Sequence, residues 1–91
     1  MAEIPADVRA RLLLDYPGET HFEAIRLVEA LQCNARVLRS IVFLSSGDFE
    51  QLERLARAAE IDWRDVVFWA EYEDYTAEYP RRVRSMEEPL P

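Results

Sequence analysis

Apolar side chains recur every three or four residues along most of the first 75 positions, the spacing of one face of an α-helix. The spacing predicts a first helix over about residues 5–15, on which Val8, Leu12 and Tyr16 share a face. Pro5 suits its first turn, and Tyr16, which precedes Pro17, should leave the helical conformation. A second apolar stripe follows from residue 24, with Ala24, Leu27, Val28 and Leu31.

Polar residues that can accept backbone hydrogen bonds mark where the later helices should begin. Thr20 and Glu23 have the spacing of a capping box, which predicts a helix start at Thr20. Gly47 can take the left-handed conformation that ends a helix. Three further residues are suited to cap the remaining helices through their side chains: Asn34, Asp48 and Asp62.

The apolar run SIVFL, residues 40–44, fits a β-strand as well as a helix. No partner strand is evident elsewhere, and a lone strand leaves its backbone groups unpaired, so a helix is the better interpretation. We therefore predict an all-α fold: a single small domain of four to five short helices over residues 1–80. Residues 81–91 have no periodicity and two late prolines, and they are expected to form a loose C-terminal tail.

The segment EIDWRDVVFWAEYEDY, residues 60–75, is apolar on two sides when placed on a helix. One side should enter the core, with Ile61 packing onto Val66 at the helix start; it holds Trp63, Val66, Val67 and Ala70. The other side is a stripe of aromatic residues: Phe68, Trp69, Tyr72 and Tyr75. Either the N-terminal helices cover this stripe, or it contacts a second chain, with the surrounding carboxylates as a polar rim.

The charge of the chain is negative and unevenly distributed. Its 91 residues carry a net charge of −7, which opposes binding to a phosphate backbone, so no nucleic-acid partner is expected. Residues 60–78 hold seven carboxylates against one base, Arg64, and three arginines follow: Arg81, Arg82 and Arg84. Guanidinium groups stack on rings and pair with carboxylates, so this tail could lie on the acidic helix of its own chain or of a neighbour.

Nothing in the sequence indicates a membrane or a secretory route. No apolar run approaches the roughly 18 residues of a membrane span, and residues 1–16 lack the basic lead and apolar stretch of a signal peptide. A cytoplasmic location is therefore the expectation. The single cysteine, Cys33, cannot form an internal disulfide, nor can it build a zinc finger with the single histidine, His21.

Catalytic chemistry is hard to place on this chain. Its two glycines, Gly18 and Gly47, cannot make a phosphate-binding loop. Cys33 and His21 are too far apart along a helix to act as nucleophile and base. Glu71 shares a face with Asp74 and Tyr75, but a solvated acidic face is the simpler interpretation. We predict no catalytic, cofactor-binding or metal-binding residues, and no enzyme activity.

The segment LARAAEIDWRDVVFWA, residues 55–70, resembles the helix-turn-helix of bacterial DNA-binding regulators. The match rests on Leu55, Ala56, Ala59, Ile61 and Val66, and it implies two helices that meet at a corner. The segment departs from the family in two ways. Glu60 stands where the family usually has a turn glycine, and the segment that would be the recognition helix is acidic. In that helix only Arg64 could contact a base edge. The chain also resembles small bacterial proteins of unknown function with an ending like RDV…AEY, which implies no activity.

The sequence thus favours a small non-catalytic protein–protein interaction or assembly module. Its partner is expected to be another protein or a second copy of itself, in a homo-oligomer. The candidate partner-contact residues are Phe68, Trp69, Tyr72, Tyr75, Arg81, Arg82 and Arg84. A transcriptional regulator derived from a helix-turn-helix protein is the first alternative, and an enzyme with an unrecognised site is the second.

Overall fold

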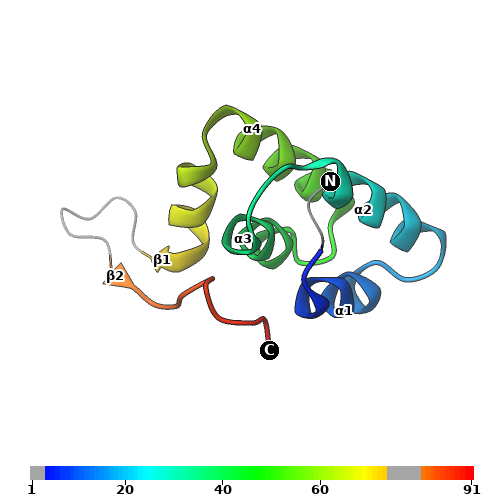
Figure 1. Cartoon of the computed structure of the whole chain (residues 1–91), viewed down its shortest axis with the longest axis horizontal. Helices are drawn as coiled ribbons and strands as arrows, with labels where there is room; N and C mark the ends of the chain where they lie inside the picture. Colours follow the sequence, from blue (N-terminus) through cyan, green and yellow to red (C-terminus); the bar gives the residue numbers. More distant parts are fainter. Residues whose placement is uncertain (1–3, 74–80) are drawn as a thin grey trace.

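The computed structural model describes residues 4–73 and 81–91, which form four helices and one short pair of strands (Figure 1). The helices are α1 (Ala6–Asp15), α2 (Glu19–Ala30), α3 (Ala35–Ser45) and α4 (Phe49–Glu71). The strands β1 (Tyr72–Glu73) and β2 (Arg81–Arg82) pair antiparallel, with Tyr72 opposite Arg82. The predicted all-α class is confirmed, and the two-residue strands are an addition that the sequence pattern did not predict.

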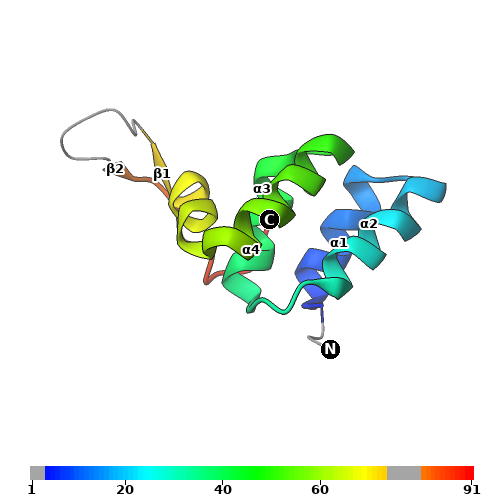
Figure 2. The same ribbon diagram turned by 90° about the horizontal axis from the view of Figure 1, so that it is seen from above.

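Helix α3 lies at the centre of the domain and packs most extensively against α4 (Figures 1 and 2). Its apolar residues cover more than one side, so α3 contacts both α1 and α4. The run 40–44, which also fitted a strand, is helical here. The centre of the core is one cluster of apolar residues, of which the following are at most 2% exposed: Val8, Leu12, Tyr16, Ala24, Val28, Val37, Leu38, Ile41, Val42, Leu52 and Val66.

The predicted caps at Asn34, Asp48 and Asp62 are confirmed. The side chain of Asn34 accepts a hydrogen bond from the amide of Val37, and Asp48 accepts from the amides two and three residues on. Gly47 has the predicted positive φ, 82°. A Cβ atom at this position would lie 3.2 Å from the carbonyl oxygen of Asp15, so the end of α1 also favours glycine there.

Three local predictions are wrong. Helix α2 begins at Glu19, directly after Gly18 with φ 69°, and has no side-chain cap, so there is no capping box at Thr20. Ile61 is 86% exposed and does not pack onto Val66. Trp63 is 45% exposed, whereas Val66, Val67 and Ala70 enter the core as predicted. The errors at Ile61 and Trp63 both lie beside a kink in α4.

The segment 83–91, here called the C-terminal strap, packs against the helices. It returns from β2 past α3 toward α1 (Figure 1). Met86 is only 3% exposed, and the amide of Leu90 donates a hydrogen bond to Asp7 Oδ2 at 3.0 Å. The loose tail expected from the sequence is therefore replaced by a segment that connects α1, α3 and α4.

No helix in the described part of the chain is both long enough and apolar enough to cross a membrane.

Candidate functional site

Helix α4 is bent at Asp62, which has an extended backbone (φ −156°, ψ 101°) inside an otherwise helical segment. Its Oδ1 atom accepts a hydrogen bond from the amide of Arg64 at 3.1 Å, as an N-cap does. The guanidinium of Arg64 donates to both carboxylate oxygens of Asp62, at 2.9 and 3.0 Å. These hydrogen bonds hold the pKa of Asp62 below its usual value, and the bond from the Arg64 guanidinium contributes most to this shift. The kink is thus fixed by charged side chains next to it.

The kink leaves two apolar side chains exposed, Ile61 and Trp63, and Trp63 lines a groove. The groove has a volume of about 480 Å³ and lies between α4 and the connection from α2 to α3. It is lined by Ala30, Leu31, Gln32, Cys33, Asn34, Val37, Ala59, Glu60 and Trp63. We call this hollow the Trp63 groove.

The Trp63 groove has a mixed lining: an apolar floor of buried residues, one aromatic ring, one carboxylate and the polar side chains of Gln32 and Asn34. Leu31, Val37 and Ala59 are buried, whereas Trp63 and Glu60 are exposed. Cys33 is half-buried, and burial raises the pKa of its thiol, with the negative charge of Glu60 raising it further. The thiol is therefore protonated at neutral pH and a poor nucleophile. This arrangement suits binding better than covalent chemistry.

A second hollow, of about 220 Å³, is also lined by Trp63. Its lining includes two residues of the predicted aromatic stripe, Phe68 and Tyr72, whose rings stack with centroids 4.9 Å apart. Both are half-buried, and Trp69 is 38% exposed. Tyr75 lies outside the described residues. Trp63, which was assigned to the core, is thus the aromatic residue that borders both hollows.

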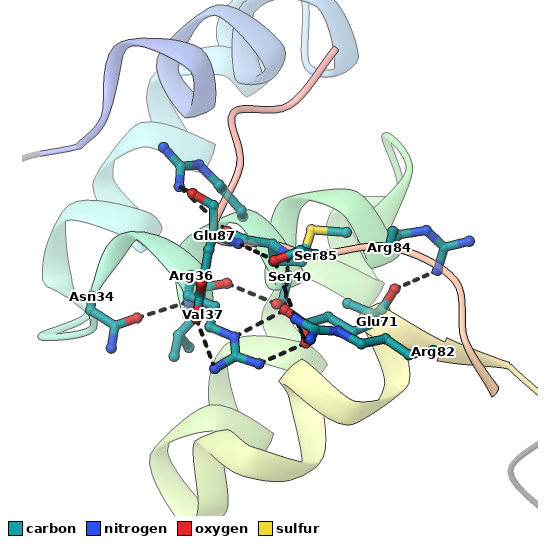
Figure 3. A network of polar contacts seen from close by, with 12 residues as sticks. Asn34, Arg36, Val37, Ser40, Glu71, Arg82, Arg84, Ser85 and Glu87 are labelled. Atoms are coloured by element: carbon teal, nitrogen blue, oxygen red, sulfur yellow. Dashed lines mark hydrogen bonds and ion pairs between the residues drawn. The ribbon is translucent and has the colours of Figure 1, made fainter. Parts of the chain in front are cut away.

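The three predicted arginines turn back onto acidic groups of their own chain. Arg81 pairs with Glu73 at 3.5 Å, and Arg82 pairs with Glu71 at 3.4 Å. Arg84 pairs with Glu73 at 3.6 Å, and its guanidinium carbon lies 4.7 Å from the ring centroid of Phe43 on α3. Arg84 also donates to the carbonyl oxygen of Ala70 (Figure 3). All three arginines thus have acidic partners within their own chain.

Glu71, the last residue of α4, is fully buried and holds the strap in place (Figure 3). Arg36 donates to both of its carboxylate oxygens, at 2.7 and 2.9 Å, and the amide of Met86 donates to Oε2 at 2.8 Å. Burial raises the pKa of Glu71, but the hydrogen bonds from Arg36 and Met86 outweigh it, so the pKa lies below its usual value.

The prediction that Glu71 belongs to a solvated acidic face is therefore wrong. One signal could have indicated its burial: Glu71 stands four residues after Val67, which places it on the edge of the buried side of the helix. Because its oxygens already accept hydrogen bonds from Arg36, Arg82 and Met86, Glu71 acts as a structural anchor for the strap.

Asp7 on α1 is the second anchor of the strap. Arg39 donates to its two oxygens at 2.8 and 3.1 Å, and this interaction, with the Leu90 amide, holds the pKa of Asp7 below its usual value. Arg39 also donates to the carbonyl oxygen of Glu87 at 2.9 Å. The strap is thus fastened at two points, the amides of Met86 and Leu90, and each donates to a carboxylate that an α3 arginine holds in place.

The structure does not bring Cys33 and His21 together, since His21 lies in the first turn of α2 and Cys33 beyond its last residue. The His21 ring contacts Phe22, with centroids 5.7 Å apart. Within residues 4–73 and 81–91, no group of three or more His, Cys, Asp or Glu side chains is placed to hold a metal ion.

No protein-family model, curated protein or solved structure matches the chain. Arguments about function therefore depend on the geometry of the Trp63 groove and its surroundings. The helix-turn-helix resemblance stays a prediction, and the one feature of it that can be compared is the meeting of two helical segments at Asp62.

Proposed function

We propose that the protein is a non-catalytic interaction module that binds another protein through the surface around the α4 kink. The observation that carries this proposal is the exposure of Ile61, at 86%, and Trp63, at 45%, on either side of Asp62. Exposed apolar groups gathered at one place are typical of interaction sites, and tryptophan is a frequent anchor residue in protein interfaces.

Other exposed apolar residues support the proposal less well. Leu13, Leu14 and Phe22, on α1 and α2, are 61%, 76% and 69% exposed. Scattered surface residues of this kind are normal in soluble proteins and need no partner. The kink differs because one of its two exposed apolar side chains, Trp63, lines a groove whose floor includes buried apolar residues, so a partner side chain has somewhere to insert.

Site-specific photo-crosslinking tests the proposal. A photo-reactive amino acid placed at position 61 should give a discrete crosslinked product in extracts of the source cells, and Trp63→Ala should remove that product. The matched control places the same group at Leu14, which is 76% exposed on α1 and should give no such product. Equal products at both positions, or a product that survives Trp63→Ala, would contradict the proposal.

The molar mass of the purified protein separates the two partner classes. Light scattering over a wide concentration range shows whether the chain associates with itself. Self-association that Trp63→Ala abolishes identifies a second copy as the partner, and a monomer that crosslinks at position 61 identifies a different protein.

DNA binding is less well supported by the surface of α4. Its second half carries the carboxylates of Asp62 and Asp65, and Arg64 is paired with Asp62. Phosphates would be repelled there, so we expect no retardation of random duplex DNA in a gel-shift at low salt. Binding that weakens steeply with added salt would instead favour the regulator.

A further inference from the structure

We propose that the Trp63 groove receives an arginine side chain of the partner protein, an inference that depends on the proposed function. Trp63 would stack on the guanidinium, Glu60 would pair with it, and the apolar floor would take the methylene groups. The partner is thus a protein that presents an arginine from a basic segment.

The lining of the groove offers what a guanidinium needs. A planar cation gains from the face of an indole ring and from a carboxylate beside it. The aliphatic part of arginine is itself apolar and suits a floor made by Leu31, Val37 and Ala59. A purely apolar side chain would remove Glu60 from water without a partner, and an acidic one would be repelled.

The protein already binds one of its own arginines in this way. The guanidinium of Arg84 lies over the ring of Phe43 and within 3.6 Å of Glu73, so an aromatic face and a carboxylate hold it together. In the Trp63 groove, tryptophan replaces phenylalanine and Glu60 replaces Glu73. Tryptophan gives the stronger cation–π contact of the two ring types.

The charge of Glu60 is available for a partner. Within the described part of the chain, no arginine pairs with Glu60, unlike Asp62, Glu71 and Glu73. Its field reaches into the groove, because it helps to raise the pKa of the Cys33 thiol. The net charge of −7 also attracts basic segments and speeds their encounter.

An NMR titration with N-acetyl-arginine N-methylamide tests the proposal on the full chain. The sequence has two tryptophans, so the indole N–H signal of Trp63 has an internal control in that of Trp69. The Trp63 signal should shift and saturate with the arginine compound, while the Trp69 signal stays in place. The neutral citrulline analogue should give no saturable shift, and the lysine analogue should bind more weakly, because an ammonium cannot stack as a plane.

Matched variants separate the groove from general charge effects. Glu60→Gln should weaken arginine binding by about two- to five-fold, the range for a partly exposed ion pair. Glu50→Gln, which removes an exposed carboxylate from the first turn of the same helix, should leave the affinity unchanged. Both positions are exposed, so both variants should fold, and the dispersion of the amide signals checks this.

Three outcomes would overturn the inference: no saturable shift, equal shifts with citrulline, or equal effects of the two glutamine variants. A Trp63 shift on raising the protein concentration alone would also overturn it, because a second copy would then fill the groove. Failure here leaves the crosslink from position 61 unchanged, whereas failure of the proposed function removes that crosslink.

Discussion

Glu71 shows at the residue scale how this small domain tolerates a fully buried carboxylate. Taking a charge out of water costs several kcal/mol unless its partners restore the lost interactions. The two-pronged contact from Arg36, the pairing with Arg82 and the amide of Met86 do so. It follows that removing the carboxylate leaves the buried amide of Met86 without its acceptor and leaves Arg36 with only its longer pairing to Glu87, at 3.5 Å.

We therefore expect Glu71→Ala to lower the free energy of unfolding by about 3–5 kcal/mol, the usual loss when a buried ion pair is broken. Glu73→Ala is the matched control. Glu73 also pairs with arginines of the C-terminal region, but its side chain is 53% exposed, so about 0–1 kcal/mol is expected. Urea titration followed by circular dichroism measures both, and equal losses would show that burial does not decide the strength of these pairs.

The same carboxylates predict how stability depends on pH. The pKa of Glu71 lies below its usual value of 4.5 and that of Asp7 below 3.8. As the pH falls past these usual values, the unfolded chain binds protons before the folded one does, so stability present at neutral pH is lost in acid. Urea midpoints measured from neutral pH down to about pH 2 should fall, and Glu71→Gln should reduce that slope. A slope unchanged by Glu71→Gln would assign the acid sensitivity to other groups.

The start of a helix can be predicted where a side chain caps a backbone amide only a few residues away. Asn34, Asp48 and Asp62 each cap a backbone amide two or three residues away, so the sequence alone was enough to place them. At Thr20 the same reasoning failed, because the N-cap is Gly18, two residues before the predicted cap, and its positive φ leads into α2 without a side-chain cap. Local signals therefore predict helix starts well, except where a glycine conformation competes with a cap.

The cap at Asp48 gives a test at the element scale. Asp48→Ala removes the acceptor for the amides of Glu50 and Gln51 and should cost about 0.5–2 kcal/mol in urea titration. Asp48→Asn keeps a good capping side chain and should cost much less. If the two variants lose equal stability, the charge of Asp48 rather than its hydrogen bonds would be responsible.

The site residues were harder to predict than the helices, for a physical reason. Helical spacing predicts Trp63 on the side of Val66 and Val67, but it cannot show whether a neighbouring element reaches that far. Around Trp63 the connection from α2 to α3 leaves a groove instead. Glu71 was missed because its partners are distant in sequence: Arg36 is 35 residues away and Met86 is 15 residues away.

At the scale of the whole molecule, the strap closes the domain onto its own first helix. The hydrogen bond from Leu90 to Asp7 joins residues 83 positions apart. The longest axis of the molecule is 42 Å, and Figure 2 shows the β1–β2 pair at one end and α1 with α2 at the other. The strap runs between these ends, so the two anchors couple regions that share few direct contacts. In the strap and just before it, Arg81, Arg82 and Arg84 pair with Glu71 and Glu73 of the same chain.

Met86 tests whether the strap belongs to its own chain in solution. Its side chain is 3% exposed, so Met86→Ala should lower the free energy of unfolding by about 2–5 kcal/mol through lost burial and the cavity left behind. Glu88→Ala, at an exposed position two residues further along the strap, is the control and should have little effect. Because the strap folds onto the chain that carries it, the urea midpoints of wild type and variants should not depend on protein concentration.

The opposite outcome is a wild-type midpoint that rises with protein concentration, together with a Met86→Ala midpoint that does not. Only association couples stability to concentration, so that outcome would mean that straps are exchanged between copies.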